Sequence, residues 1–160
     1  MEIFLLEHSF FTYILIVKFV KKINDKIFIS IDKGELVNQK LLEIAELENL
    51  KSGWINGLGA ISNVEIGYWD IEKKVYVKKV FDKDYELISL IGNVSLVDNK
   101  PFIHTHISFS DTKYKVFGGH LFDAKVIAAA EFCIFTSKYN LHRKLNCDIG
   151  LSLWDINENN

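Results

Sequence analysis

Apolar positions along the chain follow two periods, which predict one long helix among several strands. Residues 26–31 are rich in β-branched side chains and predict a strand. Between residues 35 and 50 the apolar positions recur mostly at three- and four-residue steps, which predicts a helix. Gly53 is expected to mark the end of this helix, because glycine is common just beyond a helix C-terminus.

Alternating apolar and polar residues predict further strands. Residues 62–68 and 75–80 read as two strands, and the lysine pair between them, Lys73 and Lys74, predicts the turn of a hairpin. Three more strands are expected at residues 85–97, 102–109 and 148–154, the last of which closes the sheet.

Glycines are expected to interrupt this pattern at three places. They predict a bend or a tight backbone approach at residues 57–59, a break in the strand at 92–93, and a loop leading to a short turn at 118–121. Several strands with one long helix and a single proline predict an α+β fold. We expect a mostly antiparallel, partly closed sheet with the helix packed on one face.

Composition and charge limit the function classes that suit this chain. Its 160 residues fit one domain, and 49% apolar with 25% charged residues is ordinary for a globular protein. The net charge of −2 gives no general attraction to nucleic acid or to an anionic membrane. Arg143 is the only arginine, so few side chains can make bidentate contacts to bases. DNA binding is therefore expected to be weak.

The first residues differ from the rest of the chain. Residues 10–17 form an apolar run that is too short to span a bilayer, which needs about 20 residues, and no signal-peptide cleavage site follows. Three interpretations stay open: an extra strand, a short helix packed on the domain, or residues added by an upstream start codon, which we favour. We treat residues 1–21 as an extension, 22–156 as the domain and 157–160 as a tail.

The two cysteines indicate in which cellular compartment the protein is expected. Cys133 and Cys147 have a spacing that matches no metal or redox motif. Without a secretory signal, both are expected to be reduced thiols in a cytoplasmic protein that has no membrane part.

A His-x-His pair is the most distinctive chemical feature of the sequence. Side chains alternate along a strand, so His104 and His106 project from one face with Cα atoms about 6.6 Å apart. A third histidine, His120, follows two glycines that allow a close approach to a neighbouring strand. Three histidines match the open type of zinc site. The competing interpretation is a pair that faces solvent or packs in an interface.

The sequence says less about which metal binds and which residues surround it. Imidazole suits zinc, copper, nickel and iron, and zinc is expected because it is frequent in three-histidine sites. With an ordinary histidine pKa of about 6.5, occupancy is expected to fall below about pH 6. Candidate carboxylates behind the ligands are Glu86, Asp111 and Glu131. No nucleophile or phosphate-loop motif is present, which favours a non-enzyme but leaves the question of an enzyme open.

Several segments together resemble the plants-and-prokaryotes conserved (PPC) domain. The resemblance covers about residues 22–156 and rests on the order and spacing of seven pieces. These are residues 33–35, 57–60, 64–70, 85–93, 104–106 and 118–121, followed by Glu131. It implies an α+β domain with a strand at 128–135, assembled as a homotrimer. It also implies a metal held at the positions of His104, His106 and His120, since some members place histidines around an ion.

Two departures bear on DNA binding, which is often ascribed to this family. Asp84 stands where the plant form has an arginine, and no Arg-Gly-Arg-Pro element is present. The leading hypothesis is therefore a non-enzymatic, metal-binding homotrimer with an assembly or regulatory role. The alternatives are a DNA-binding transcriptional regulator and a small metal-dependent hydrolase or lyase.

Overall fold

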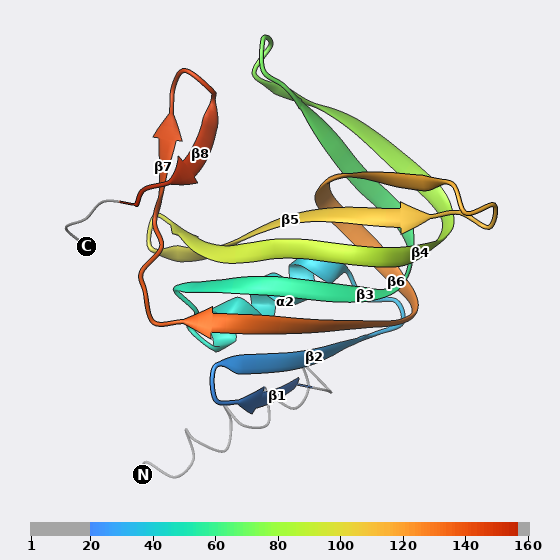
Figure 1. The fold of residues 1–160 in the computed structure, drawn as a ribbon, viewed down its shortest axis with the longest axis horizontal. Helices are drawn as coiled ribbons and strands as arrows, with labels where there is room; N and C mark the ends of the chain where they lie inside the picture. Colours follow the sequence, from blue (N-terminus) through green and yellow to red (C-terminus); the bar gives the residue numbers. More distant parts are fainter. Residues whose placement is uncertain (1–19, 157–160) are drawn as a thin grey trace, which may run out of the picture.

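The computed structural model describes residues 20–156, which form eight strands and one helix within that range (Figure 1). The interpretations of residues 1–19 and 157–160 lie outside the described residues. The elements are β1 (Val20–Ile23), β2 (Lys26–Asp32), α2 (Val37–Leu47), β3 (Ser52–Asp70), β4 (Val75–Val97), β5 (Lys100–Ser110), β6 (Val116–Ser137), β7 (Arg143–Asn146) and β8 (Leu151–Trp154).

Six of these strands form one antiparallel sheet, in the order β1-β2-β6-β3-β4-β5. A further pairing between β5 and β6 closes part of this sheet into a ring of four strands. The predicted α+β fold with a partly closed sheet is confirmed. The prediction that residues 148–154 close the sheet is wrong, because β8 pairs with β7 in a separate two-stranded sheet (Figure 1).

The long strands run through two of the glycine positions that were expected to break them. Gly92 lies inside β4, where a Cβ atom would come within 2.5 Å of the His104 carbonyl oxygen on β5. Gly118 lies inside β6, where a Cβ atom would come within 2.6 Å of the Ile107 carbonyl oxygen. The predicted break and loop are therefore wrong, and these glycines allow strands to approach closely. The expected bend at 57–59 is present as a shift of register in β3.

Helix α2 ends earlier than predicted, and Gly53 lies in β3 instead. Asn49 adopts the left-handed conformation, with φ of 50°. Its N–H donates to the Glu46 carbonyl (3.0 Å), and the N–H of buried Leu50 donates to the Ala45 carbonyl (2.8 Å). These two bonds make a Schellman motif, in which asparagine takes the place usually held by glycine.

The core lies between α2 and the concave face of the ring. The helix buries an apolar stripe that consists of Val37, Leu41, Ile44 and Ala45. Facing it are buried side chains from four strands, among them Ile55, Leu90, Phe109 and Ile134. None of the helices in the described part of the chain is long and apolar enough to cross a bilayer.

The other face of the sheet is covered at one end by β7, whose Arg143 bonds to Asn93 and Ser95 of β4, and much of the rest is open. Large apolar side chains that project there from the three central strands are 40–55% exposed, among them Trp54, Leu58, Ile91 and Phe135. Trp54 and Phe135 are opposite one another in the β3–β6 ladder, so the exposed groups lie on adjacent strands. A large exposed apolar surface of this kind is typical of an interaction face.

Candidate metal site

The pairing of β5 with β6 brings the three predicted histidines together. His106 is directly opposite His120 in this ladder, at the point where the two strands begin to diverge. His104 lies on the same side of β5 as His106. Thr105 between them points the other way: its side chain is buried and its hydroxyl donates to Asn38 Oδ1 on α2 (2.8 Å). The predicted alternation along this strand is confirmed.

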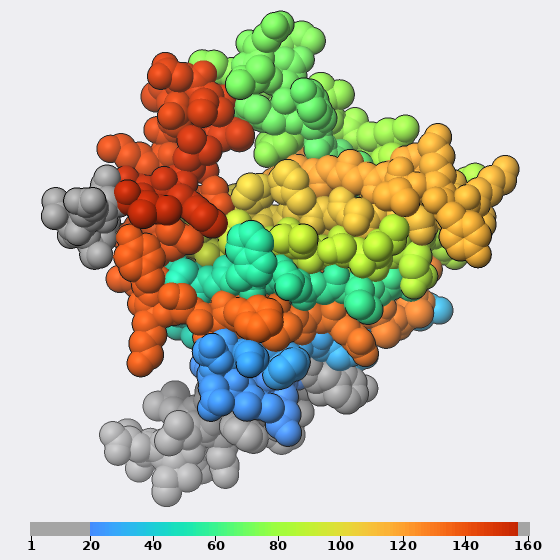
Figure 2. All heavy atoms as spheres, in the orientation of Figure 1, coloured from blue at the N-terminus to red at the C-terminus, as the bar shows by residue number. Residues whose placement is uncertain are grey.

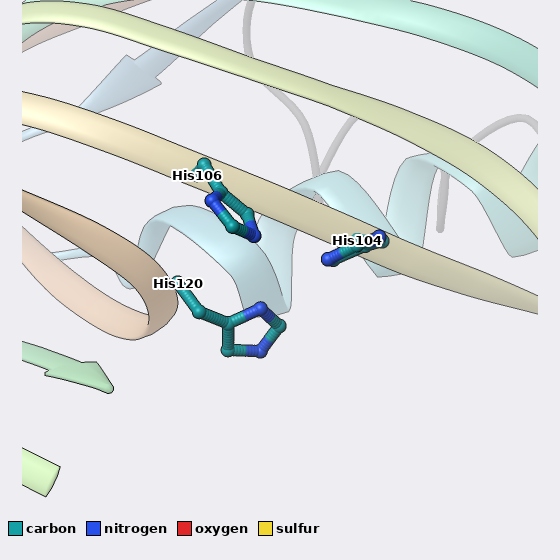
Figure 3. A group of neighbouring side chains, drawn as sticks. All are labelled: His104, His106 and His120. Carbon is teal, nitrogen blue, oxygen red and sulfur yellow. The ribbon is translucent and has the colours of Figure 1, made fainter. Parts of the chain in front are cut away.

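The imidazoles point toward a common centre (Figure 3). One nitrogen of each ring lies within 4.8 Å of the others, and the ring centroids are 5.1–5.4 Å apart. Tetrahedral zinc with Zn–N distances of about 2.0–2.1 Å would bring its nitrogens to about 3.3 Å from one another. Side-chain rotations that move each nitrogen by about 1 Å would close that difference, so the donor set fits an ion.

The electrostatics of the cluster favour neutral imidazoles, which are the form that binds metal. Burial lowers the pKa of His104 and of His120 to about 4, and it also lowers the pKa of His106. The positive charge of Arg143 contributes at His104, and neighbouring histidines contribute at His120. The expectation of metal loss below about pH 6 rested on an ordinary pKa. Protons compete for these nitrogens only at lower pH.

A histidine nitrogen without a hydrogen-bond partner among the described residues further supports a bound metal. His120 Nδ1 is buried and has no hydrogen-bond partner within the described part of the chain. A buried polar atom left unpaired costs about 1–3 kcal/mol, and such atoms are rare in native proteins. Coordination of an ion would satisfy this nitrogen, so the residues present fit a bound metal.

Aromatic side chains fix the position of His120. Tyr76, on β4, stacks on its ring with a centroid distance of 4.7 Å, and Phe122 meets it edge-on at 5.2 Å. Lys78 Nζ lies 3.6 Å above the Phe122 ring and also pairs with Glu65. The far part of the β3–β4 hairpin therefore supports one side of the cluster.

Arg143, on β7, supports the other side. Its Nη2 contacts His104 Nδ1 at 3.2 Å and donates to Asn93 Oδ1 at 2.9 Å. Its Nε donates to Ser95 Oγ at 2.7 Å, and its Nη1 donates to the Ser152 carbonyl at 2.8 Å. These bonds attach the C-terminal hairpin to β4 beside the cluster. Sequence reasoning missed this residue as part of the site, and its only signal was that it is the single arginine.

The cluster opens into a cavity of about 730 Å³. Its wall comes from the start of α2, from β5 and β6 where they diverge, and from the C-terminal hairpin. Figure 2 shows the surface hollowed between that hairpin (red) and β5 (yellow). The tip of the β3–β4 hairpin contacts the turn between β7 and β8, because Trp69 Nε1 donates to the Ile149 carbonyl and Lys74 Nζ to the Cys147 carbonyl.

The carboxylates proposed from the sequence lie elsewhere. Glu86 is exposed on β4 opposite Ser110, and Glu131 is exposed on β6. Asp111 accepts the N–H groups of residues 113 and 115 in its own turn. Among residues 20–156, no carboxylate belongs to the histidine cluster. A role of Glu86, Asp111 and Glu131 behind the histidine ligands stays a prediction. The acidic residue that does line the cavity is Asp123.

Comparisons with known proteins agree with the resemblance described above. The model of the Plants and Prokaryotes Conserved (PCC) domain, the family called PPC above, matches residues 19–138. None of the curated proteins compared with the chain matches it.

Three solved structures are similar. A candidate DNA-binding protein from Bacteroides thetaiotaomicron is 30% identical with a TM-score of 0.84, covering 86% of this chain and 96% of that one. A PPC protein from Pyrococcus horikoshii is 34% identical with a TM-score of 0.77, covering 88% and 95%. A metal-containing protein from Archaeoglobus fulgidus is 36% identical with a TM-score of 0.75, covering 83% and 94%.

Proposed function

The chain belongs to the Plants and Prokaryotes Conserved (PCC) domain family, and on that basis we propose that it is a cytoplasmic, metal-binding homotrimer with an assembly or regulatory role. The observation that carries this proposal is the convergence of His104, His106 and His120 around an unsatisfied buried nitrogen. The 36% identical metal-containing protein supports it further.

Zinc is the proposed ion, held by the three histidines. Three neutral imidazoles without a carboxylate or thiolate suit a borderline-soft divalent metal more than magnesium or calcium, which prefer oxygen ligands. A zinc ion bound by three protein ligands keeps an open position, where it would polarise a ligand or a water molecule.

The proposed trimer would cover the exposed apolar face of the sheet. Trp54, Leu58, Ile91 and Phe135 are the groups that a second copy would bury. A trimer of this 18.5 kDa chain would have a mass of about 55 kDa. Sedimentation equilibrium should give that mass, and a monomer mass at micromolar concentration would contradict the assembly.

A second candidate, a small metal-dependent hydrolase or lyase, is favoured by one observation. The cavity is lined by His104 and His120, so a small molecule would reach the open position of the ion. Asp123 lines the same cavity, but its carboxylate accepts backbone N–H groups of α2 and is therefore occupied. The site lacks an unengaged general base among the described residues, and we place this candidate second.

DNA binding, the third candidate, has less support from the site. Some similar proteins carry that description, but the single arginine of this chain is half-buried beside the histidines and bonded to neutral groups. It is not placed to contact a duplex.

Native mass spectrometry combined with elemental analysis tests the proposal in one measurement. We expect a three-chain species that carries three zinc ions. A trimer without metal would refute the metal part, and a zinc-loaded monomer would refute the assembly part.

A further inference from the structure

Arg143 is a cation that is bonded to neutral groups in the described part of the chain. Within residues 20–156 it makes no ion pair, and its hydrogen-bond partners are two side-chain oxygens, one carbonyl and one imidazole, all of them neutral. A guanidinium remains charged in proteins even where burial lowers its pKa. A half-buried charge that is bonded only to neutral groups is only partly compensated. The wall of the cavity therefore carries, beside the histidines, a positive charge that an anion would balance. Asp123 also lines the cavity, but its carboxylate is bonded to backbone N–H groups of α2.

The contact between Arg143 and His104 has a consequence for metal binding. A guanidinium nitrogen can only donate, so His104 Nδ1 must accept in this contact. A neutral imidazole has one nitrogen lone pair, and the contact uses it. An ion that binds His104 must take that lone pair, whichever nitrogen it uses, and the Arg143 Nη2–H is then released. Metal and arginine compete for the same histidine.

A second N–H group of Arg143 would be available beside the released Nη2–H. Nη1 has a second N–H for which no acceptor lies in the described part of the chain, because its only bond goes to the Ser152 carbonyl. Two N–H groups on neighbouring nitrogens form the fork that binds a carboxylate in bidentate fashion. Arg143 lines the cavity together with His104 and His120.

The rest of the cavity indicates what the anion is attached to. Most of its wall is apolar, with leucines from α2, β7 and β8 and the ring of Phe102: Leu42, Phe102, Leu145, Leu151 and Leu153. A volume of about 730 Å³ lies within the usual range for small-molecule sites. A dianionic phosphate or sulfate would need more donors than one guanidinium supplies. A monoanionic group on an apolar chain matches both the single cation and the wall.

We propose that this cavity binds a small aliphatic carboxylate, whose anionic group lies between Arg143 and the ion held by the histidine cluster. The inference rests on the proposed metal site and adds the ligand class to it. Because the ligand would bind the guanidinium in its metal-released state, carboxylate and zinc must strengthen one another's binding by the same factor. Through this coupling, the concentration of an aliphatic acid would regulate how much of the protein carries the metal.

The first experiment measures zinc affinity in the absence of any carboxylate, by competition with a chelator. The variants are Arg143→Met, which removes donor and charge but keeps an apolar stem, and Lys144→Gln, which removes a charge from the same strand at a position that does not line the cavity. Arg143→Met should bind zinc about fivefold more tightly than wild type, the equivalent of one lost competing hydrogen bond. Lys144→Gln should match wild type. Unchanged or weaker zinc binding in a folded Arg143→Met protein would overturn the competition.

The second experiment uses the wild-type protein, so that it does not depend on a variant that folds. Zinc affinity is measured with hexanoate, with hexanol as the uncharged control, and with sulfate as the dianion. Hexanoate should tighten zinc binding about tenfold, as a charge-assisted pair gained on binding implies. Hexanol and sulfate should leave it unchanged. Arg143→Met should lose the hexanoate effect, and Arg143→Lys should retain part of it.

The outcomes separate the two proposals. If the wild type binds zinc but hexanoate has no effect, or if Arg143→Met keeps the full effect, the ligand proposal is overturned and the metal site stands. If sulfate acts as strongly as hexanoate, the carboxylate assignment is wrong. If the wild type binds no zinc in the first titration, the metal site fails and the ligand proposal fails with it.

Discussion

Removal of the Asp123 carboxylate should loosen the start of helix α2. The residue before this helix is Leu36, which cannot cap it, and no side chain of the helix itself does so. Asp123 on β6 takes that role from across the fold. Its carboxylate accepts the N–H groups of Asn38 (2.9 Å) and Gln39 (3.2 Å), and also that of Ala124 (2.8 Å).

The size of the effect follows from these bonds. Asp123→Ala removes the acceptor of a part-buried N–H at Asn38 and of an exposed N–H at Gln39. An unpaired buried group costs about 1–3 kcal/mol, and a lost N-cap costs about 0.5–2 kcal/mol. Part of this is offset, because burial raises the pKa of Asp123 against the effect of its hydrogen bonds. The ionised form is therefore disfavoured in the folded protein. We expect a net loss of about 2 kcal/mol for Asp123→Ala.

Asp123→Asn keeps one acceptor oxygen and buries no charge, so it should cost less than about 1 kcal/mol. Urea unfolding measures both variants. With a slope of about 2 kcal/mol per molar, the midpoint of Asp123→Ala should fall by about 1 M. Asp82→Ala, an exposed aspartate on β4, is the control and should change the free energy of unfolding by less than about 0.5 kcal/mol. An unchanged Asp123→Ala midpoint, or equal losses for the Ala and Asn variants, would refute the capping role.

Three further outcomes are expected. Because the folded-state pKa values of His104 and His120 are about 4, below the ordinary 6.5, the metal-free protein should lose stability as the pH falls from about 6.5 toward 4. Thermal melts should show this loss, and a variant with asparagine at both positions should have a flatter profile. Gly92→Ala should destabilise the fold by about 1–3 kcal/mol in urea, because its Cβ atom would meet the β5 backbone. Fluorescence anisotropy should show no sub-micromolar binding to a DNA duplex at physiological salt.

The sequence predicted the kinds of elements better than their extents. The β-branched run in β2 and the periodic stripe of α2 are local signals, and both elements form where they were expected. Gly92 and Gly118 could not be assigned from the sequence alone. A glycine that breaks a strand and one that lets two strands approach look the same until the neighbouring strand is known. The helix end was misplaced for a related reason, since Asn49 provided the left-handed residue before Gly53.

The sequence could predict part of the histidine cluster, the pair His104 and His106, but not the place of His120 beside them. Alternation along one strand places His104 and His106 on one side without further information. His120 is sixteen residues from His104, and its distance from the pair depends on the β5–β6 register, which no spacing reveals. Arg143 reaches the cluster from a separate two-stranded sheet. Its position depends on where that small sheet packs, which is decided by tertiary contacts.

The most direct test of the central claim is a zinc titration of the wild type against a variant that carries both His104→Ala and His106→Ala. Both residues lie on the side of β5 away from Thr105 and the buried side chains, so the variant should fold. With protein purified without chelator, we expect one zinc per chain in the wild type and a loss of most of that zinc in the variant. Equal zinc binding by the two folded proteins would contradict the account.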